Sequence, residues 1–557
     1  MMGSRYFCSR ALPRWVGGSV LFLTMLLLPL WSGAQPVRGP AALPQPGIDV
    51  QDYDFDLVLS DTTKRIKGTA RVHVRITTDT LTAVRLDLIG PPGHSGDSGM
   101  EVLGVSEAGA DVAYAHSNDL LRIRPSDGLS EGDVHHFRIE YAGVPADGLI
   151  IGTNRHGDRT FFGDNWPNRA RHWLPVVDHL SDKATVSFRV TAPAEFEVVS
   201  NGALLSDSLA GDMRITRWGT DVPLPTKVMV IGVADFVVDT VATIDGVPVQ
   251  SWVYPEDRSV GFKDLGQAPP ILAFFEENLG PYPYEKLANV QSATRYGGME
   301  NAAAIFYSEK AVADGRDSTP LLAHEIAHQW YGNTVTEADW PHLWLSEGFA
   351  TYLTGLYLEH AQGDAAFTEY MKEGRRQVRA FHEKRPDAPL VDTTFRDPNE
   401  LLNTNPYQKG SWVLHMLRHE MGLETFWKGL RTYYERYRNQ NAQTRDFRQV
   451  MEEVSGLDLK TFFEQWTRRA GHPVIEGQWR YDAAAEECVV ALRQTQSEPV
   501  FRISVDLSVQ TGTAQTETVT MNTRRLEHRI PCSESPSAVA LDPNTRLLGE
   551  FSMTQAE

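Results

Sequence analysis

The sequence predicts a multidomain α+β protein, and three observations support this prediction. A chain of 557 residues is too long for a single hydrophobic core, so we expect about two to four domains. Apolar and polar residues alternate between about residues 48 and 242, which indicates an all-β N-terminal domain. Helical patterns dominate residues 243–472, and alternation returns in residues 473–557, where a small β-sandwich domain is expected.

The first 34 residues resemble an export signal. Arginines precede an apolar stretch from Val16 to Leu30, and the small residues Ser32 and Ala34 indicate cleavage after Ala34. The alternative is an uncleaved membrane anchor, but the apolar stretch is short for a membrane span. We therefore expect residues 1–34 to be a signal peptide, residues 35–47 to be a linker rich in Pro, Gly and Ala, and the mature protein to be periplasmic or extracellular.

The charge of the chain argues against two classes of partner. The formal net charge is -19, and Lys and Arg form no block of any length. An acidic surface disfavours nucleic acids and anionic membranes. We expect neither a nucleic acid nor a stable membrane partner, and the sequence leaves the oligomeric state open.

The predicted strands and helices follow from periodicity. In the N-terminal domain, the clearest strands span residues 53–59, 70–76, 137–141 and 186–190. A first helix opens at Pro269-Pro270 and closes at Gly280, the expected placement of proline and glycine. Further helices are predicted at Leu321–Tyr331, Glu347–His360, Phe367–Lys384, Ser411–Met421, Phe426–Arg438 and Leu459–Arg468.

The C-terminal region shows its cleanest alternation from Phe501 to Val509. It also holds Cys488 and Cys532, the two cysteines that remain after the signal peptide. In an oxidising compartment such a pair can form a disulfide, and the alternative is two buried free thiols. Two cysteines give no framework pattern that decides between them.

The strongest functional signal is the sequence HEIAH, from His324 to His328. On a helix, residues four apart lie on one face, so His324 and His328 can both offer an imidazole nitrogen to one Zn²⁺. Glu325 then lies where its carboxylate can reach a metal-bound water. The alternative is that the two histidines simply pack on a helix face.

The residues around this motif predict how its helix begins and ends. Thr319 can cap the helix and Pro320 suits its first turn. Gly332-Asn333 can end it.

A catalytic zinc site commonly has three protein ligands and one water, so a third ligand is expected. We predict Glu347, which follows His328 after eighteen intervening residues. That length allows the first helix to finish and a second helix to return alongside it. Glu347 is expected to begin this second helix, with Ser346 as its N-cap.

Three separated motifs in this order resemble the M1 family of gluzincin aminopeptidases. The HEIAH segment followed by Glu347 matches the gluzincin pattern. Residues 297–301, with the sequence GGMEN, resemble the aminopeptidase signature of the family, and Tyr407 in PYQKG resembles its catalytic tyrosine. Together the matches cover nearly the whole mature chain. Weaker matches occur at residues 170–175, Asp178, 328–333 and 343–345.

This resemblance implies a saddle-like N-terminal β domain, a thermolysin-like and mainly α catalytic domain, and a C-terminal region. Many family members carry a large α-helical C-terminal domain that covers the active site. The sequence ends after the predicted β-sandwich, so we expect that domain to be absent and the site to be more open, unless a second copy covers it.

The resemblance also implies the catalytic roles. One Zn²⁺ per chain, bound by His324, His328 and Glu347, would lower the pKa of its water and polarise the scissile carbonyl. Glu325 would act as general base. Tyr407 would donate a hydrogen bond to the oxyanion, although nothing local to this tyrosine distinguishes it from a packed aromatic residue.

The GGMEN segment implies an exopeptidase. Glu300, beside the metal, would bind the protonated α-amine of the substrate and so place the first peptide bond over the zinc. Gly297 and Gly298 would let the substrate backbone approach and form strand-like hydrogen bonds. Met299 and Asn301 complete the substrate-binding segment.

One departure from the family concerns the pocket for the first residue. Relatives often place Gln or Glu from the N-terminal domain beside the substrate amine. The comparable segment here is residues 162–168, in which Asp164 is the candidate, unless the alignment slips by one residue. The preferred N-terminal residue therefore stays open.

Two other functions compete with a zinc aminopeptidase acting on peptides with a free N-terminus. A zinc endopeptidase would use the same chemistry, but Glu300 in its intact motif argues against it. A catalytically inactive peptide-binding scaffold would be expected to lack a ligand, the base or the tyrosine, and all of these are present.

Overall fold

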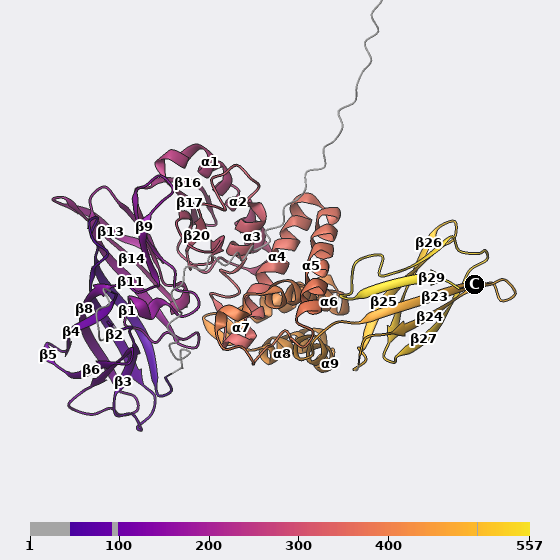
Figure 1. Cartoon of the computed structure of the whole chain (residues 1–557), viewed down its shortest axis with the longest axis horizontal. Helices are drawn as coiled ribbons and strands as arrows, with labels where there is room; N and C mark the ends of the chain where they lie inside the picture. The colour runs from indigo at the N-terminus through magenta and orange to yellow at the C-terminus, as the bar shows by residue number, and fades with distance from the viewer. Residues whose placement is uncertain (1–44, 92–97, 498, 557) are drawn as a thin grey trace, which may run out of the picture. The chain divides into compact units, whose positions relative to one another are not determined.

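The computed structural model describes residues 45–91, 98–497 and 499–556 (Figure 1). The predicted signal peptide, its cleavage site at Ala34 and most of the predicted linker lie outside these residues. Among the described residues, no helix is both long enough and apolar enough to cross a bilayer.

The N-terminal region is built on an eight-stranded sheet with the order β13-β14-β11-β1-β2-β8-β4-β5. β1 pairs in parallel with β11 and antiparallel with β2, which places Phe55 between Phe188 and Ala70, all three of them buried. The strands predicted in this region are therefore confirmed. The strands are β1 (Ile48–Val58), β2 (Ile66–Ile76), β4 (Gly99–Glu107), β5 (Ala110–Asp111), β8 (Val134–Val144), β11 (Lys183–Pro193), β13 (Ala203–Ala210) and β14 (Met213–Pro225).

Two smaller sheets accompany this large one, with the orders β3-β7-β6 and β12-β15-β10-β9. Their strands are β3 (Val84–Asp87), β6 (Ala113–Ser117), β7 (Leu120–Arg124), β9 (Leu149–Thr153), β10 (Arg159–Gly163), β12 (Glu197–Ser200) and β15 (Ile231–Ala234).

The middle region combines a five-stranded sheet, of order β16-β17-β18-β20-β19, with the helices. β17, β18 and β20 run parallel, whereas β19 is antiparallel to β20 and forms the edge of the sheet. The strands are β16 (Val237–Ile244), β17 (Val247–Val253), β18 (Leu287–Ser292), β19 (Gly298–Met299) and β20 (Ala304–Ser308). A separate parallel pair joins β21 (Val335–Glu337) to β22 (Gln440–Ala442).

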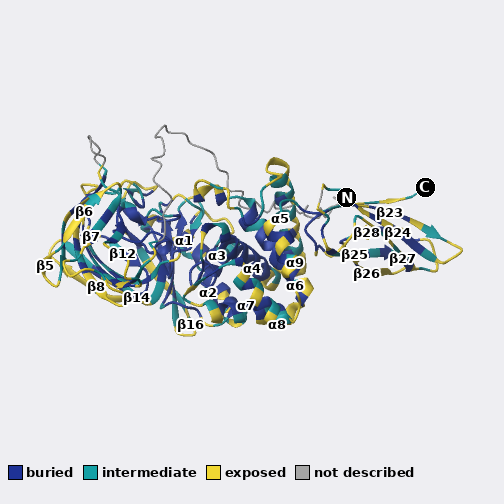
Figure 2. Ribbon diagram, turned by 90° about the horizontal axis from the view of Figure 1, so that it is seen from below, coloured by how far each residue is buried: buried dark blue, intermediate teal, exposed yellow. Residues whose placement is uncertain are grey.

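The helices of this region pack around α4, which is buried along most of its length (Figure 2). The helices are α1 (Arg258–Leu265), α2 (Ala268–Leu279), α3 (Thr319–Ala327), α4 (Trp344–Gln362), α5 (Asp364–Lys384), α6 (Gly410–Met421), α7 (Leu423–Tyr437), α8 (Thr444–Ser455) and α9 (Lys460–Phe463), and α9 continues into a π-helical turn (η7, Glu464–Arg468). The predicted helices are all present, whereas α1 and α8 were not predicted.

The end of α3 differs from the prediction. The helix stops at Ala327, four residues before the predicted end at Tyr331, because the amide of Gln329 bonds to a carbonyl three residues back instead of four. The chain therefore tightens into turns, and Gly332-Asn333 lies in the turn region and not at the helix end.

The C-terminal region contains strands, as predicted, in a four-stranded sheet of order β27-β24-β23-β29 and a three-stranded sheet of order β26-β25-β28. Whether they make a β-sandwich stays a prediction. Cys488 is buried, Cys532 is half-buried, and both are free thiols in this structure. The strands are β23 (Val474–Asp482), β24 (Glu487–Gln494), β25 (Ile503–Gln510), β26 (Ala514–Met521), β27 (Arg525–Pro531), β28 (Ala538–Leu541) and β29 (Glu550–Gln555).

Candidate active site

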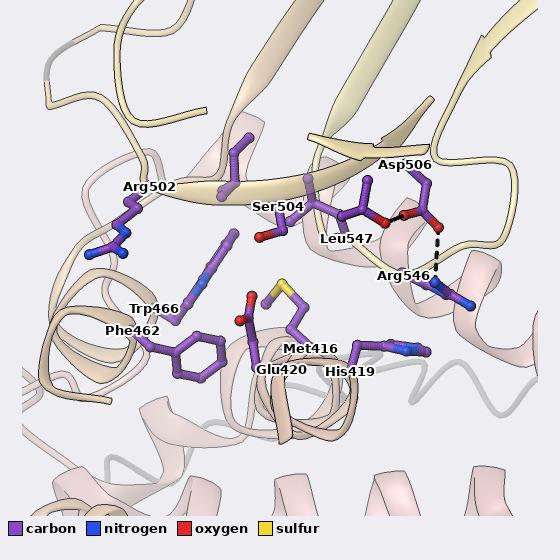
Figure 3. A pocket seen from close by; sticks show the side chains of 12 residues that line it. Met416, His419, Glu420, Phe462, Trp466, Arg502, Ser504, Asp506, Arg546 and Leu547 are labelled. Atoms are coloured by element: carbon purple, nitrogen blue, oxygen red, sulfur yellow. Dashed lines mark hydrogen bonds and ion pairs between the residues drawn. The ribbon is translucent and has the colours of Figure 1, made fainter. Parts of the chain in front are cut away.

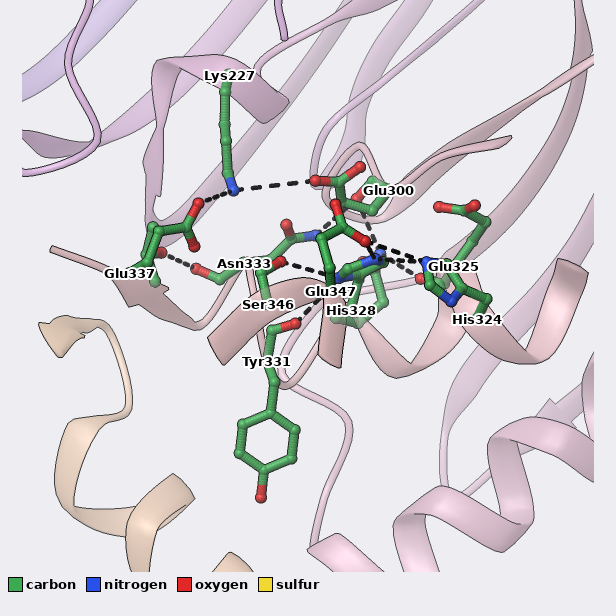
Figure 4. Close-up of polar contacts among 12 residues, drawn as sticks. Lys227, Glu300, His324, Glu325, His328, Tyr331, Asn333, Glu337, Ser346 and Glu347 are labelled. Atoms are coloured by element: carbon green, nitrogen blue, oxygen red, sulfur yellow. Dashed lines mark hydrogen bonds and ion pairs between the residues drawn. The ribbon is translucent and has the colours of Figure 1, made fainter. Parts of the chain in front are cut away.

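Helices α3 and α4 bring the three predicted metal ligands together (Figure 4). Nε2 of His324 lies 3.1 Å from Nε2 of His328. Oε2 of Glu347 lies 3.3 Å from the first nitrogen and 3.2 Å from the second. The three atoms therefore form a nearly equilateral triangle.

This triangle fits a tetrahedral zinc ion. Zn–N and Zn–O bonds of about 2.0–2.1 Å at tetrahedral angles separate two ligand atoms by about 3.3–3.4 Å. The observed separations of 3.1–3.3 Å agree with that value. Two imidazoles and a carboxylate are also a donor set that zinc prefers in catalytic sites.

A second layer of contacts orients His328. Its Nδ1 lies 3.1 Å from the carbonyl oxygen of Tyr331 and 3.1 Å from the hydroxyl of Ser346. A proton on Nδ1 that is donated to the carbonyl leaves the lone pair of Nε2 facing the centre of the triangle, which is the form that binds a metal.

Two predicted helix caps are wrong. α4 begins at Trp344, with Leu343 in the N-cap position, so Glu347 lies in its first turn and the Ser346 hydroxyl serves His328 instead. Thr319 is the first residue of α3 and not its cap, and its amide bonds to the Asp317 carboxylate. At the start of α3 the Asp317 carboxylate accepts the amide hydrogen bond, whereas at the start of α4 no side chain caps the helix.

Burial and mutual attraction shift the pKa values of the triangle in different directions. Burial lowers the pKa of His324. Burial also opposes the charged form of His328, but the carboxylate of Glu347 outweighs it and raises the pKa of His328 to about 9. Although burial favours the neutral acid, the two histidines hold the pKa of Glu347 well below its usual range. Glu347 is therefore ionised, and its negative charge holds the proton on His328 until a metal ion replaces it.

Glu325 lies on α3 and is almost completely buried. Burial raises its pKa well above the ordinary value, and the nearby carboxylates of Glu300 and Glu347 act in the same direction. The space for its side chain exists because residue 298 is a glycine: a Cβ on Gly298 would lie only 2.2 Å from Oε1 of Glu325. Gly298 therefore gives room to the proposed base, a role that the sequence alone did not indicate.

The GGMEN segment contains the edge strand β19, which consists of Gly298 and Met299. Gly298 and Met299 pair with Tyr307 and Phe306 of β20, and no other strand among the described residues pairs with them. The carbonyl of Glu300 accepts hydrogen bonds from the side-chain amides of Gln329 (3.0 Å) and Asn333 (2.6 Å), which fix its backbone.

The side chains that follow the edge strand are buried. Within the described chain, Oε1 of Glu300 has no hydrogen-bond partner, and neither has the side-chain amide of Asn301. A buried carboxylate oxygen without a partner is costly, so Glu300 is equipped to receive a donor.

Tyr407 lies in a π-helical turn (η6, Asn405–Lys409) that leads into α6. Its ring stacks on that of His324, with centroids 6.0 Å apart and an angle of 13° between the planes. The start of α6 packs closely on α4, since a Cβ on Gly348 would lie 2.9 Å from Cα of Gly410. Burial, and then the carboxylates of Glu347 and other acids, raise the pKa of Tyr407 well above its usual value, so its hydroxyl keeps its proton.

Asp164 is buried and already paired. Its carboxylate lies 2.5 Å from the guanidinium of Arg169 and 3.7 Å from that of Arg295, which also pairs with Asp147. Its Oδ2 has no hydrogen-bond partner among the described residues. Its role beside a substrate amine stays a prediction.

A buried lysine that the sequence did not single out completes the surroundings of Glu300. Nζ of Lys227 lies 2.7 Å from Oε1 of Glu337 and 3.9 Å from Oε1 of Glu300 (Figure 4). Lys183, the first residue of β11, makes a similar contact between the two regions. Its ammonium donates to the carbonyls of Asn333 (3.0 Å) and Thr334 (2.8 Å).

A further cavity of about 220 Å³ lies elsewhere, between α6, η7 and β25 (Figure 3). Its walls include Glu420, Trp466 and the ion pair between Asp506 and Arg546. None of the predicted site residues lines it.

Two family models match the chain. The Peptidase M1 N-terminal domain matches residues 50–228, and the Peptidase family M1 domain matches residues 264–466. Together they cover more than half of the chain.

Curated relatives and solved structures agree with these matches. Glutamyl aminopeptidase from Homo sapiens is 31% identical over 332 residues, which are 56% of this chain and 34% of that protein. Aminopeptidase M1-A from Oryza sativa subsp. japonica is 30% identical over 325 residues, 56% of this chain and 37% of the relative. The chain thus spans little more than a third of the length of these relatives.

The crystal structure of an M1 zinc metallopeptidase from Deinococcus radiodurans has 25% sequence identity and a TM-score of 0.65, and covers 76% of this chain and 95% of that chain. A mutant of the same metallopeptidase, with the same identity, score and coverage, has been solved bound to a Tyr-Ser-Ala substrate.

Proposed function

Since the chain belongs to peptidase family M1, we propose that it is a zinc aminopeptidase that releases the N-terminal residue of peptides. One observation carries the proposal: the metal triangle occurs in one site with a buried carboxylate oxygen, Oε1 of Glu300, that has no hydrogen-bond partner among the described residues. The carboxylate of Glu300 acts on the charges of both histidines: it opposes the burial that lowers the pKa of His324, and it adds to the effect of Glu347 in raising the pKa of His328.

His324, His328 and Glu347 would hold the zinc. When bound, zinc would supply a Lewis acid and lower the pKa of a water molecule. Glu325 would take the proton of the attacking water and pass it to the leaving amine. Tyr407, which keeps its proton, would donate a hydrogen bond to the developing oxyanion.

Two features support cleavage at the first peptide bond. The free edge of β19 offers backbone groups to an extended substrate, so the peptide would add as a further strand. Glu300, directly after that strand, would pair with the substrate ammonium through Oε1, which accepts no hydrogen bond from the described residues. A substrate held at its ammonium presents only its first peptide bond to the metal.

The other sequence-based predictions are part of the proposal. They are export with cleavage near Ala34, domain boundaries after residues 47, 242 and 472, and a β-sandwich in residues 473–557. Asp164 is retained as a candidate contact for the first residue.

Cleavage of a free-amine peptide, compared with its N-acetylated twin, tests the proposal. Purified protein should release the first residue from the free peptide only, and a chelator should abolish this release until zinc is added back. Internal cleavage of both peptides would favour a zinc endopeptidase. Cleavage of neither peptide, by protein that contains zinc, would favour a binding scaffold.

A further inference from the structure

We propose that Lys227 is a positioning residue for Glu300, the group assigned above to the substrate ammonium. The inference rests on the proposed function and deepens it, since it assigns part of substrate-amine recognition to the N-terminal region. Lys227 lies in a short helical turn (η2, Thr226–Val228) directly after β14, at the end of the segment that the N-terminal domain model matches. Neither the motifs nor the family matches single it out.

The contacts make Lys227 a neighbour of two carboxylates. Its ammonium lies 2.7 Å from Oε1 of Glu337 and 3.9 Å from Oε1 of Glu300. The side chains of the lysine and of Glu337 are 1% and 0% exposed, and that of Glu300 is 7% exposed, so water screens these charges weakly. Burial alone would lower the pKa of Lys227, but Glu337 and then Glu300 raise it above the usual value, so the lysine stays charged.

Lys227 restricts the Glu300 carboxylate, which no hydrogen bond to Oε1 from the described residues holds in place. The backbone of Glu300 is fixed by Gln329 and Asn333, but its Oε1 has no hydrogen-bond partner among the described residues. The attraction of an ammonium at 3.9 Å to this oxygen restricts the rotation of the carboxylate. The lysine is too far away to occupy the oxygen with a hydrogen bond, so the oxygen stays available to a substrate.

Glu337 makes this arrangement compatible with substrate binding. A lone lysine beside Glu300 would repel the substrate ammonium. Since Glu337 pairs directly with Lys227, the pair is nearly neutral as a unit, and Glu300 keeps its attraction for a cation. We therefore expect removal of the pair to weaken amine binding through loss of orientation, and not through a change in net charge.

The double variant Lys227→Met/Glu337→Gln tests the role without leaving a buried charge unpaired. We expect its KM for a free-amine dipeptide to rise about tenfold, within the usual range of coupling between contacting residues, while kcat changes little. Lys286→Met is the matched control, because Lys286 is also buried and donates to the carbonyls of Ser200 and Gly202. Its loss should lower Tm without raising KM.

The background Glu300→Gln separates positioning from a structural role. If Lys227 acts through Glu300, the pair variant should add no further loss in this background. Binding of an amino-acid hydroxamate, measured by calorimetry, gives the same comparison without turnover. Wild-type KM in the pair variant, or an equal loss with and without Glu300, would overturn the inference. If the wild type and Lys286→Met already fail to prefer the free amine, the proposed function has failed instead.

Discussion

A methyl group at position 298 is expected to displace the carboxylate of Glu325, the proposed general base. A Cβ on Gly298 would lie 2.2 Å from Oε1 of Glu325 and 2.5 Å from its Cδ, which is closer than non-bonded atoms approach. The crowded atoms are at the end of a side chain, so the carboxylate would move and the backbone would stay in place. Ordinary contact requires a shift of about 1 Å, and such a misplacement of a catalytic group costs on the order of 100-fold in rate.

Gly298→Ala should therefore lower kcat for a free-amine peptide on the order of 100-fold. The zinc content should stay at the wild-type level, because a Cβ at position 298 does not have the metal ligands as its nearest neighbours. Steady-state kinetics, metal analysis and thermal unfolding measure the three quantities. Gly152→Ala is the control, since a Cβ there meets nothing within 4 Å and all three quantities should match the wild type.

Two results would contradict this expectation. A kcat within about threefold of the wild-type value, less than 1 kcal/mol of barrier, would mean that Glu325 is not the group whose position limits the reaction. A large loss of zinc or a large drop in Tm would mean that the strain moves α3 or the backbone instead of the carboxylate.

Three other substitutions test separate groups. Glu325→Gln should lower kcat about 10²–10⁴-fold at unchanged zinc content, and near-wild-type turnover would exclude Glu325 as the base. Tyr407→Phe should lower kcat about 10²-fold with little change in KM, and an effect on KM alone would indicate a substrate contact instead. Burial lowers the pKa of His342 from 6.5 to about 4, so between these values the unfolded chain binds a proton that the folded chain does not. Stability from this residue is present above pH 6.5 and is lost as the pH falls towards 4. His342→Asn keeps an acceptor for Thr444 but does not titrate, so the Tm of the wild type relative to this variant should fall between pH 7 and 4.5, and a constant difference would contradict the shifted pKa.

Residues whose positions follow from one helix were predictable from the sequence. His324 lies on α3, and His328 follows its last residue in helical conformation, so the two residues, four apart, lie on one face without any tertiary information. Glu347 needed one further assumption, that a second helix returns alongside the first. The helix ends were less predictable, since the hydroxyl of Ser346 is used by His328 and not by its own helix.

Other features depend on distant parts of the chain and leave no local pattern. β19 is only two residues long, so no periodicity can reveal it; it exists through its pairing with β20. Lys227 donates to Glu337, which is 110 residues further along the chain, and no local motif marks the segment around the lysine. By contrast, the start of α8 does carry a local signal, a capping box between Gln443 and Asp446.

The contacts across the two matched regions limit how freely the protein can be recombined. Lys183 and Lys227, in the region matched by the N-terminal domain model, donate to carbonyls and a carboxylate of the region matched by the M1 domain model. Lys286 of the second region donates to a carbonyl of the first. A chimera that joins this catalytic region to an N-terminal region from a relative lacking these lysines would leave Glu337 buried without its counter-charge. Successful exchange would have to transfer both sides of each contact together, so the two regions form one structural piece and are not interchangeable modules.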